Sequence, residues 1–269
     1  YGYNHEEAVV CFQRALEHDP DCAMAHWGVA YAAGPNYNLP WDLLDDRGKA
    51  KALNCAYDAT QCAQALLDRC TPVERELIRA LPARYPQRDP APARHRWDHD
   101  FADAMRAAFA AQPDHLDLRT IYVESLLNLT PWQMWDLRTG QPAEGAATMG
   151  AQEALEWAMA NDPAAMSHPG RVHRYGHLRE RSTTPEKALK AGDVLRTLVP
   201  DAGHLVHMPT HIDVLCGHYQ NVVHWNEQAV IADLKYYQRE GAFNIYTGYR
   251  QHNYHFVIYG ALFLGQMEP

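Results

Sequence analysis

The sequence predicts an all-α protein, and three observations support this fold class. Small and apolar residues recur at helical spacing through most of the chain, for example over 4–20 and 152–162. Several of these segments end at an Asp-Pro or a Gly-Pro pair, which ends a helix because proline lacks an N–H and clashes with the preceding turn. Alternating apolar and polar runs, which are typical of strands, are nearly absent. The sequence therefore favours a fold of helices packed on helices.

The predicted helices follow one another along the chain with short breaks between them. Those of the first half cover 4–20, 22–33 and 115–129, and two longer helical hairpin segments cover 47–70 and 94–111. Those of the second half cover 152–162, 185–200 and 222–237, and a tight turn at 217–219 precedes the last of them. Four prolines predict a loop over 81–92, and 129–142 is the longest irregular stretch.

Two loops share a Pro-Trp pair that directly follows a helical segment. The pairs are Pro40-Trp41 and Pro131-Trp132. Loops carry binding sites disproportionately, so the two tryptophans can wall a pocket on one edge of the helical array. They can equally fasten the loops to neighbouring helices, and the sequence leaves both interpretations open.

Composition limits the classes of partner. The chain has 269 residues, of which 47% are hydrophobic and 21% charged, so it is globular and long enough to bury a large core. The net charge of −9 argues against nucleic acid or an anionic membrane surface as the main partner, because both require basic surfaces. No apolar run approaches the roughly 18–20 residues that span a bilayer.

The cysteines favour a reducing compartment. The chain has six, at Cys11, Cys22, Cys55, Cys62, Cys70 and Cys216, and none forms a C-x-x-C pair. We expect reduced thiols in a cytoplasmic protein, with only Cys216 close enough in sequence to a histidine cluster to be a metal ligand. No secretory signal is visible, and both ends are expected to be truncated relative to the natural protein.

Eight of the sixteen histidines fall in three clusters with short, helical spacings. The clusters are His168, His173 and His177, then His204, His207 and His211, and finally His252 and His255. Imidazole is the commonest protein ligand of transition metals, and such spacings bring several rings to one helix face. The clusters therefore predict a buried metal centre, although a single helical histidine is more often an ordinary core or surface residue.

The expected geometry differs among the clusters. At about 100° per residue, the second cluster spans an arc of about 60° on one helix face, but Pro209 within it predicts a kink or a new helix. His173 and His177 are adjacent on a helix face, and His168 lies just before the predicted helix start at Pro169. His252 and His255, three residues apart, also share a face.

The ligand set is rich in nitrogen, which favours copper most and also suits zinc. Two or three groups of imidazoles suit a dinuclear or larger copper centre that binds and reduces dioxygen. Iron is a further alternative, although di-iron helical proteins usually repeat an E-x-x-H pattern that is not repeated in this chain.

Glu180 is a candidate catalytic residue that can accept the second ring N–H of His177. Tyr254, beside the last cluster, is a candidate hydrogen-bond donor or redox partner, and ordinary packing is the alternative for both side chains.

The segment 4–20 resembles the second helix and terminal proline of a tetratricopeptide repeat (TPR). The stretches 34–38, 168–173, 202–212 and 251–256 resemble histidine-rich motifs of a group of TPR-domain proteins whose function is not established. This resemblance implies a TPR-like α-solenoid of degenerate helical hairpins, with a single domain over 1–269 and one histidine site. His177 is followed by Leu-Arg-Glu-Arg, which is more charged than the His-Ala-x-Glu-Ala pattern of the group.

The first functional hypothesis is an oxygen-using, metal-dependent oxidoreductase that acts on a small organic substrate. One alternative is a zinc-dependent hydrolase with Glu180 as the base. Another is a TPR scaffold that binds a protein partner through the solenoid surface.

Overall fold

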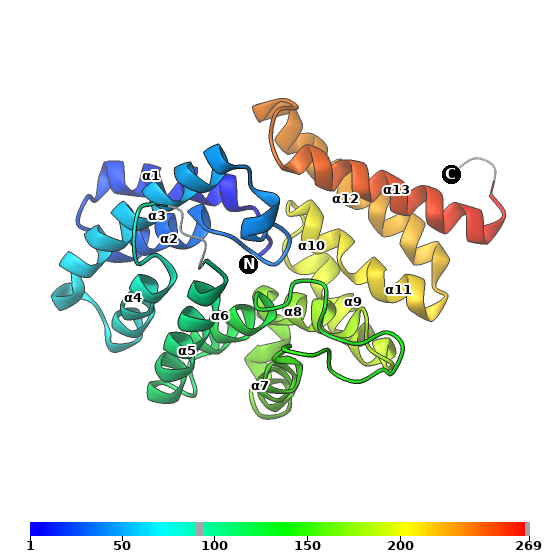
Figure 1. Cartoon of the computed structure of the whole chain (residues 1–269). Helices are drawn as coiled ribbons and strands as arrows, with labels where there is room; N and C mark the ends of the chain where they lie inside the picture. Colours follow the sequence, from blue (N-terminus) through cyan, green and yellow to red (C-terminus); the bar gives the residue numbers. More distant parts are fainter. Residues whose placement is uncertain (90–93, 267–269) are drawn as a thin grey trace. The chain divides into compact units, whose positions relative to one another are not determined.

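The structure is a computed structural model that describes residues 1–89 and 94–266 (Figure 1). Within this part of the chain the regular secondary structure is helical, apart from two isolated bridges, and the predicted all-α class is confirmed. The α-helices are α1 (His5–His18), α2 (Ala23–Ala33), α3 (Asp46–Ala65), α4 (Pro72–Arg84), α5 (Arg94–Ala111), α6 (Leu116–Leu127), α7 (Thr148–Asn161), α8 (Pro169–Arg179), α9 (Leu189–Leu198), α10 (Gly203–His207), α11 (Pro209–Cys216), α12 (Tyr219–Glu240) and α13 (Tyr246–Leu264). Short 3-10 helices are η1 (Trp41–Leu43), η2 (Leu67–Arg69), η3 (Pro163–Ser167) and η4 (Pro185–Ala188).

The chain divides into two compact units. The histidine unit comprises Tyr1–Asn4, Trp135–Ala143 and Gln152–Pro269, and the N-terminal unit comprises His5–Met134 and Glu144–Ala151. The expectation of one TPR-like domain over 1–269 stays a prediction, as does the solenoid arrangement.

Neighbouring helices of the N-terminal unit pack against one another in sequence order, with α1 on α2, α2 on α3, α4 on α5 and α5 on α6. Small residues allow the close approach of α1 and α2. A Cβ at Gly28 would lie 2.4 Å from the ring of Phe12, so only glycine fits beneath that ring. The core of this part of the unit is formed by Trp41, Leu53, Leu81 and other buried apolar residues.

Helix α4 corrects the predicted loop over 81–92. Leu81–Arg84 belong to the last turn of α4, with Pro82 inside the helix, whereas the loop begins at Tyr85 and its 90–92 portion lies outside the described residues. A capping box starts α4, in which Thr71 N donates to Glu74 Oε2 over 2.7 Å and Glu74 N donates to Thr71 Oγ1 over 3.4 Å. Burial of Ile78 and Leu81 and this cap outweigh the cost of one proline near the helix end.

In the histidine unit, α12 and α13 lie side by side along much of their length (Figure 1), and α10 packs on α12. The predicted interruption at Pro209 is confirmed, since α10 ends at His207 and α11 begins at Pro209. The predicted tight turn before α12 is also present, because Gly217 ends α11 in the left-handed conformation at φ 78°. Among the helices that the structure describes, none is long and apolar enough to cross a membrane.

Candidate metal centre

Six of the eight clustered histidines converge in the histidine unit as two groups of three. Triad A consists of His173, His177 and His204, and triad B consists of His207, His211 and His252. Within each triad the candidate ligand atoms all lie within 4.8 Å of one another. The three sequence clusters thus regroup, because the second cluster is divided between the triads.

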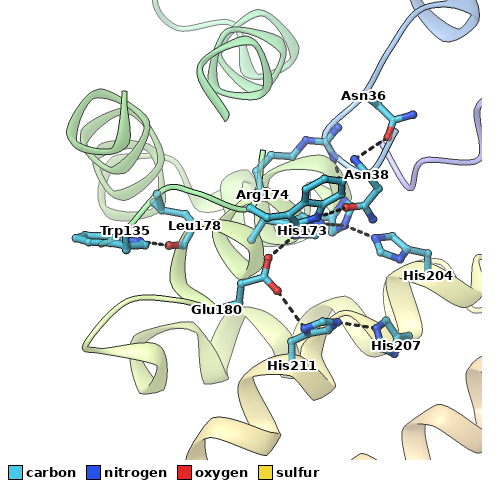
Figure 2. Close-up of polar contacts among 12 residues, drawn as sticks. Asn36, Asn38, Trp135, His173, Arg174, Leu178, Glu180, His204, His207 and His211 are labelled. Carbon is cyan, nitrogen blue, oxygen red and sulfur yellow. Dashed lines mark hydrogen bonds and ion pairs between the residues drawn. The ribbon is translucent and has the colours of Figure 1, made fainter. Parts of the chain in front are cut away.

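Triad A depends on both helix geometry and helix packing. His173 and His177 are one turn apart on α8, which places their rings on one face. His204 comes from the first turn of α10. His173 Nε2 lies 3.0 Å from His204 Nε2 (Figure 2). The same atom lies 3.0 Å from His177 Nε2, and all three residues are buried.

Triad B forms across the break at Pro209. His207 is the last residue of α10 and His211 lies in the first turn of α11, yet their Nε2 atoms are 2.9 Å apart. His252 reaches the same point from α13, with its Nε2 3.4 Å from His211 Nε2. The ring of Phe256, one turn further along α13, packs against all three imidazoles at centroid distances of 4.6–4.8 Å.

These separations match those of ligands that share one ion. Nitrogens bound at about 2.0–2.1 Å to a single metal lie about 2.9 Å apart at a right angle and about 3.4 Å apart at the tetrahedral angle. Two Nε2 separations in each triad, 2.9 to 3.4 Å, fall in the same interval. These pairs already have the spacing of nitrogens that share one ion.

Glu180 contacts one ring of each triad on its Nδ1 side, and Figure 2 shows the contact with His211. Its Oε1 accepts from Nδ1 of His177 over 2.9 Å, and its Oε2 lies 3.0 Å from Nδ1 of His211. Burial by itself would raise the pKa of Glu180, but the charges and hydrogen bonds of His177 and His211 outweigh it and lower the pKa below its ordinary value. The ionised carboxylate only accepts, so both Nδ1 atoms carry hydrogen.

Asn226 on α12 sets the tautomer of His207 in the same way. The amide nitrogen of Asn226 donates to the carbonyl oxygen of Val222 over 2.7 Å, and this oxygen can only accept. The other amide atom, Oδ1, therefore faces Nδ1 of His207 at 2.6 Å and accepts its hydrogen. Thr210 Oγ1 receives the second amide hydrogen over 2.9 Å, which holds the Asn226 side chain in place.

Nδ1 of His173 faces both a hydrogen-bond acceptor and a hydrogen-bond donor. The atom lies 2.7 Å from the carbonyl oxygen of Tyr1, which accepts, and 3.0 Å from Nη1 of Arg174, which donates. The shorter contact favours a hydrogen on Nδ1. The ring of Tyr3 also packs against this side of triad A, at 4.9 Å from the ring of His173 and 5.5 Å from that of His204.

Burial favours the neutral form of five of the triad rings. It is the main cause that lowers the pKa of His173, His177, His204, His207 and His252 below the ordinary value. Neighbouring imidazoles add to the shift in both triads, because charged rings would repel one another. The pKa of His252, whose ring is partly exposed, falls to about 4. Near pH 7 these rings are in the neutral form that binds metals.

Neutral rings with hydrogen on Nδ1 leave a lone pair on Nε2. His177 and His207 are held in this tautomer by Glu180 and Asn226, so their lone pairs point into the triads. In triad B the Nε2 atoms of His207 and His211 are 2.9 Å apart, within hydrogen-bond distance. A cation bound between these atoms would take the place of that hydrogen bond, and the arrangement is suited to hold one.

The remaining predicted site residues lie outside both triads. His168 caps the start of α8, with Nδ1 accepting from the backbone N–H of Arg171 over 3.3 Å. His255 and Tyr254 are exposed on α13, and Tyr254 retains 48% of its accessible surface. Cys216 is not a member of either triad.

Two residues near the rings were not assigned a role by the sequence. Asn226 and Tyr3 come from segments distant from every histidine cluster, so no local signal could single them out. Tyr249, by contrast, is visible in the sequence as a residue that flanks the last cluster, one turn before His252 on α13. Its ring stacks on His204 at 5.0 Å.

Comparison with known proteins returned no match. No family model matches the chain, and neither a curated protein nor a solved structure matches it. The resemblance of the sequence motifs to histidine-rich TPR proteins therefore stays a prediction.

Proposed function

We propose that the chain is a metal-dependent oxidoreductase with a dinuclear copper centre, one ion in each triad, that uses dioxygen to oxidise a small organic substrate. The observation that carries the proposal is the convergence of imidazole Nε2 atoms at 2.9–3.4 Å in two adjacent triads. Two ions side by side can exchange two electrons, which is the number needed to reduce dioxygen to hydrogen peroxide.

Ligand chemistry supports copper. Each triad consists of imidazoles alone, and the nearest carboxylate, Glu180, contacts the Nδ1 side of the rings. Nitrogen ligands favour copper over the other divalent first-row metals, whereas iron sites of helical proteins usually include carboxylates. Three ligands also leave a coordination position open for dioxygen or substrate.

The proposed reaction balances as a two-electron transfer. Two copper ions, held by the imidazoles of the two triads, would supply the two electrons that reduce dioxygen to hydrogen peroxide with two protons from solvent. A substrate oxidised by two electrons, with release of two protons, would restore the reduced ions. The protein would hold the ions and admit the substrate.

Triad B is the side on which substrate would enter. The side chain of His211 is 25% exposed and the ring of His252 is partly exposed, whereas all three residues of triad A are buried. Both oxygens of Glu180 face imidazole Nδ1 atoms, so we propose that Glu180 positions the rings and does not transfer a proton to substrate. Tyr254 is exposed and would act only on a molecule that approaches that face of α13.

Elemental analysis with electron paramagnetic resonance tests the proposal. Protein expressed with supplementary copper and iron should retain about two equivalents of copper per chain, and the reduced protein should consume dioxygen. Retention of less than about one tenth of an equivalent of every transition metal would end the proposal.

A zinc-dependent hydrolase is the second candidate function. Triad B by itself offers three imidazoles and an open coordination position, which suits a catalytic zinc ion. Retention of zinc alone, with no oxygen uptake by the protein, would favour this candidate over the oxidoreductase.

A further inference from the structure

A second candidate site lies in the N-terminal unit, where the two Pro-Trp loops line one cavity of about 310 Å³. The lining comes from three segments, namely residues 40–43 of the first loop, residues 128–133 of the second, and Asp98 and His99 of α5. All of these residues belong to one compact unit, so the cavity does not depend on the placement of the histidine unit.

Two residues of the lining each carry a buried polar atom that has no hydrogen-bond partner among the described residues. Trp41 is only 2% exposed, and its indole Nε1 has no hydrogen-bond partner among the residues that the structure describes. Oδ1 of Asn128, at the end of α6, is also buried with no hydrogen-bond partner within the described chain. A buried donor or acceptor without a partner costs about 1–3 kcal/mol, so a ligand that satisfies both atoms gains on binding.

Among the side chains that the structure describes, the charge of the lining is negative. These side chains include the carboxylates of Asp42 and Asp98 and no lysine or arginine. Asp98 also interacts electrostatically with the buried Arg84, which is not part of the lining. Indole rings attract cations through the negative potential of their faces, and carboxylates add to that attraction. A cation therefore suits this cavity better than an anion.

We propose that the cavity binds a small organic ammonium ion that also carries a hydroxyl or carbonyl oxygen. The ammonium group lies against the indoles near Asp98, and the oxygen accepts from Nε1 of Trp41. Where the ligand has an N–H or O–H, Asn128 Oδ1 accepts it. The cavity volume of about 310 Å³ is sufficient for a molecule of the size of choline.

Choline and its uncharged analogue, in which carbon replaces the nitrogen, provide a direct test. Isothermal titration calorimetry on the full chain, treated with a chelator to remove metals, separates this cavity from the triads. We expect choline to bind with a Kd of about 1 mM or lower and the uncharged analogue to bind at least about tenfold more weakly. Equal binding of the two compounds, or no heat with choline, would overturn the proposal.

Variants locate the binding. Asp98→Asn and Trp132→Leu should each weaken choline binding at least about fivefold. Asp100→Asn is the matched control, because Asp100 is on the same helix α5 but outside the lining, and its affinity should equal that of the unchanged chain. Circular dichroism checks the fold of each variant. Asp98→Asn preserves the shape of the side chain, so it still tests the proposal if Trp132→Leu unfolds. Unchanged affinity in folded Asp98→Asn would contradict the proposal.

Discussion

Glu180 Oε2 lies 3.0 Å from Nδ1 of His211, a residue of a different helix and of the other triad. The opposite oxygen of the same carboxylate accepts from His177. One buried anion therefore sets the tautomer of a ring in each triad, so both triads depend on a residue that contacts neither proposed ion.

Replacement of Glu180 by glutamine tests this dependence. Glutamine has one oxygen in place of two, so either His177 or His211 loses its acceptor and can turn its lone pair away from the triad. We expect copper affinity to fall about 10–100-fold, as measured by competition with a chelator. Glu186→Gln, an exposed carboxylate of the same unit, is the control and should bind copper normally.

His252 and His255 make a matched pair on one helix. Only His252 belongs to triad B, while His255 is exposed one turn away. His252→Ala should reduce the copper content from about two equivalents to about one and abolish oxygen uptake, and His255→Ala should change neither. Equal copper loss in both variants, by elemental analysis, would show that triad B is not the site.

Gly203 begins α10 beneath a buried carboxylate. A Cβ at this position would lie 2.0 Å from Asp233 Oδ1 and 2.9 Å from the backbone oxygen of Ala229, so α10 and the ring of His204 would have to move. We expect Gly203→Ala to cost about 1–3 kcal/mol in the free energy of unfolding and to weaken metal binding at triad A. Gly248→Ala, with no atom near its Cβ, should unfold at or above the original denaturant midpoint.

Asp233 makes stability depend on pH. Burial raises its pKa to about 7, against the opposing effects of the hydrogen bond from Asn253 and the charge of Arg250. Its ordinary pKa is near 4, so the folded protein binds the extra proton and stability falls as pH rises from about 4 through about 7. Asp233→Asn keeps an oxygen for Asn253 and removes this loss. Denaturant unfolding should show a gain on the order of 2 kcal/mol at about pH 8 and little or none at about pH 4.

Local sequence pattern was sufficient for most of the helices and for the candidate ligands. Residue spacing within a helix follows from backbone geometry, so the pairing of His173 with His177 and the interruption at Pro209 could both be predicted. The pattern did not reveal that α4 continues through Pro82, because the burial of Ile78 and Leu81 that supports the helix depends on its neighbours.

The tertiary structure alone decided how the imidazoles are grouped. His204 and His207 share a short helix, yet one turns to α8 and the other to α11 and α13, since each ring joins the helix packed on its own side. The same packing brings Asn226 and Glu180 to the Nδ1 atoms and leaves His255 in solvent. Contacts between distant segments arise from the burial of apolar faces, and no local spacing contains that information.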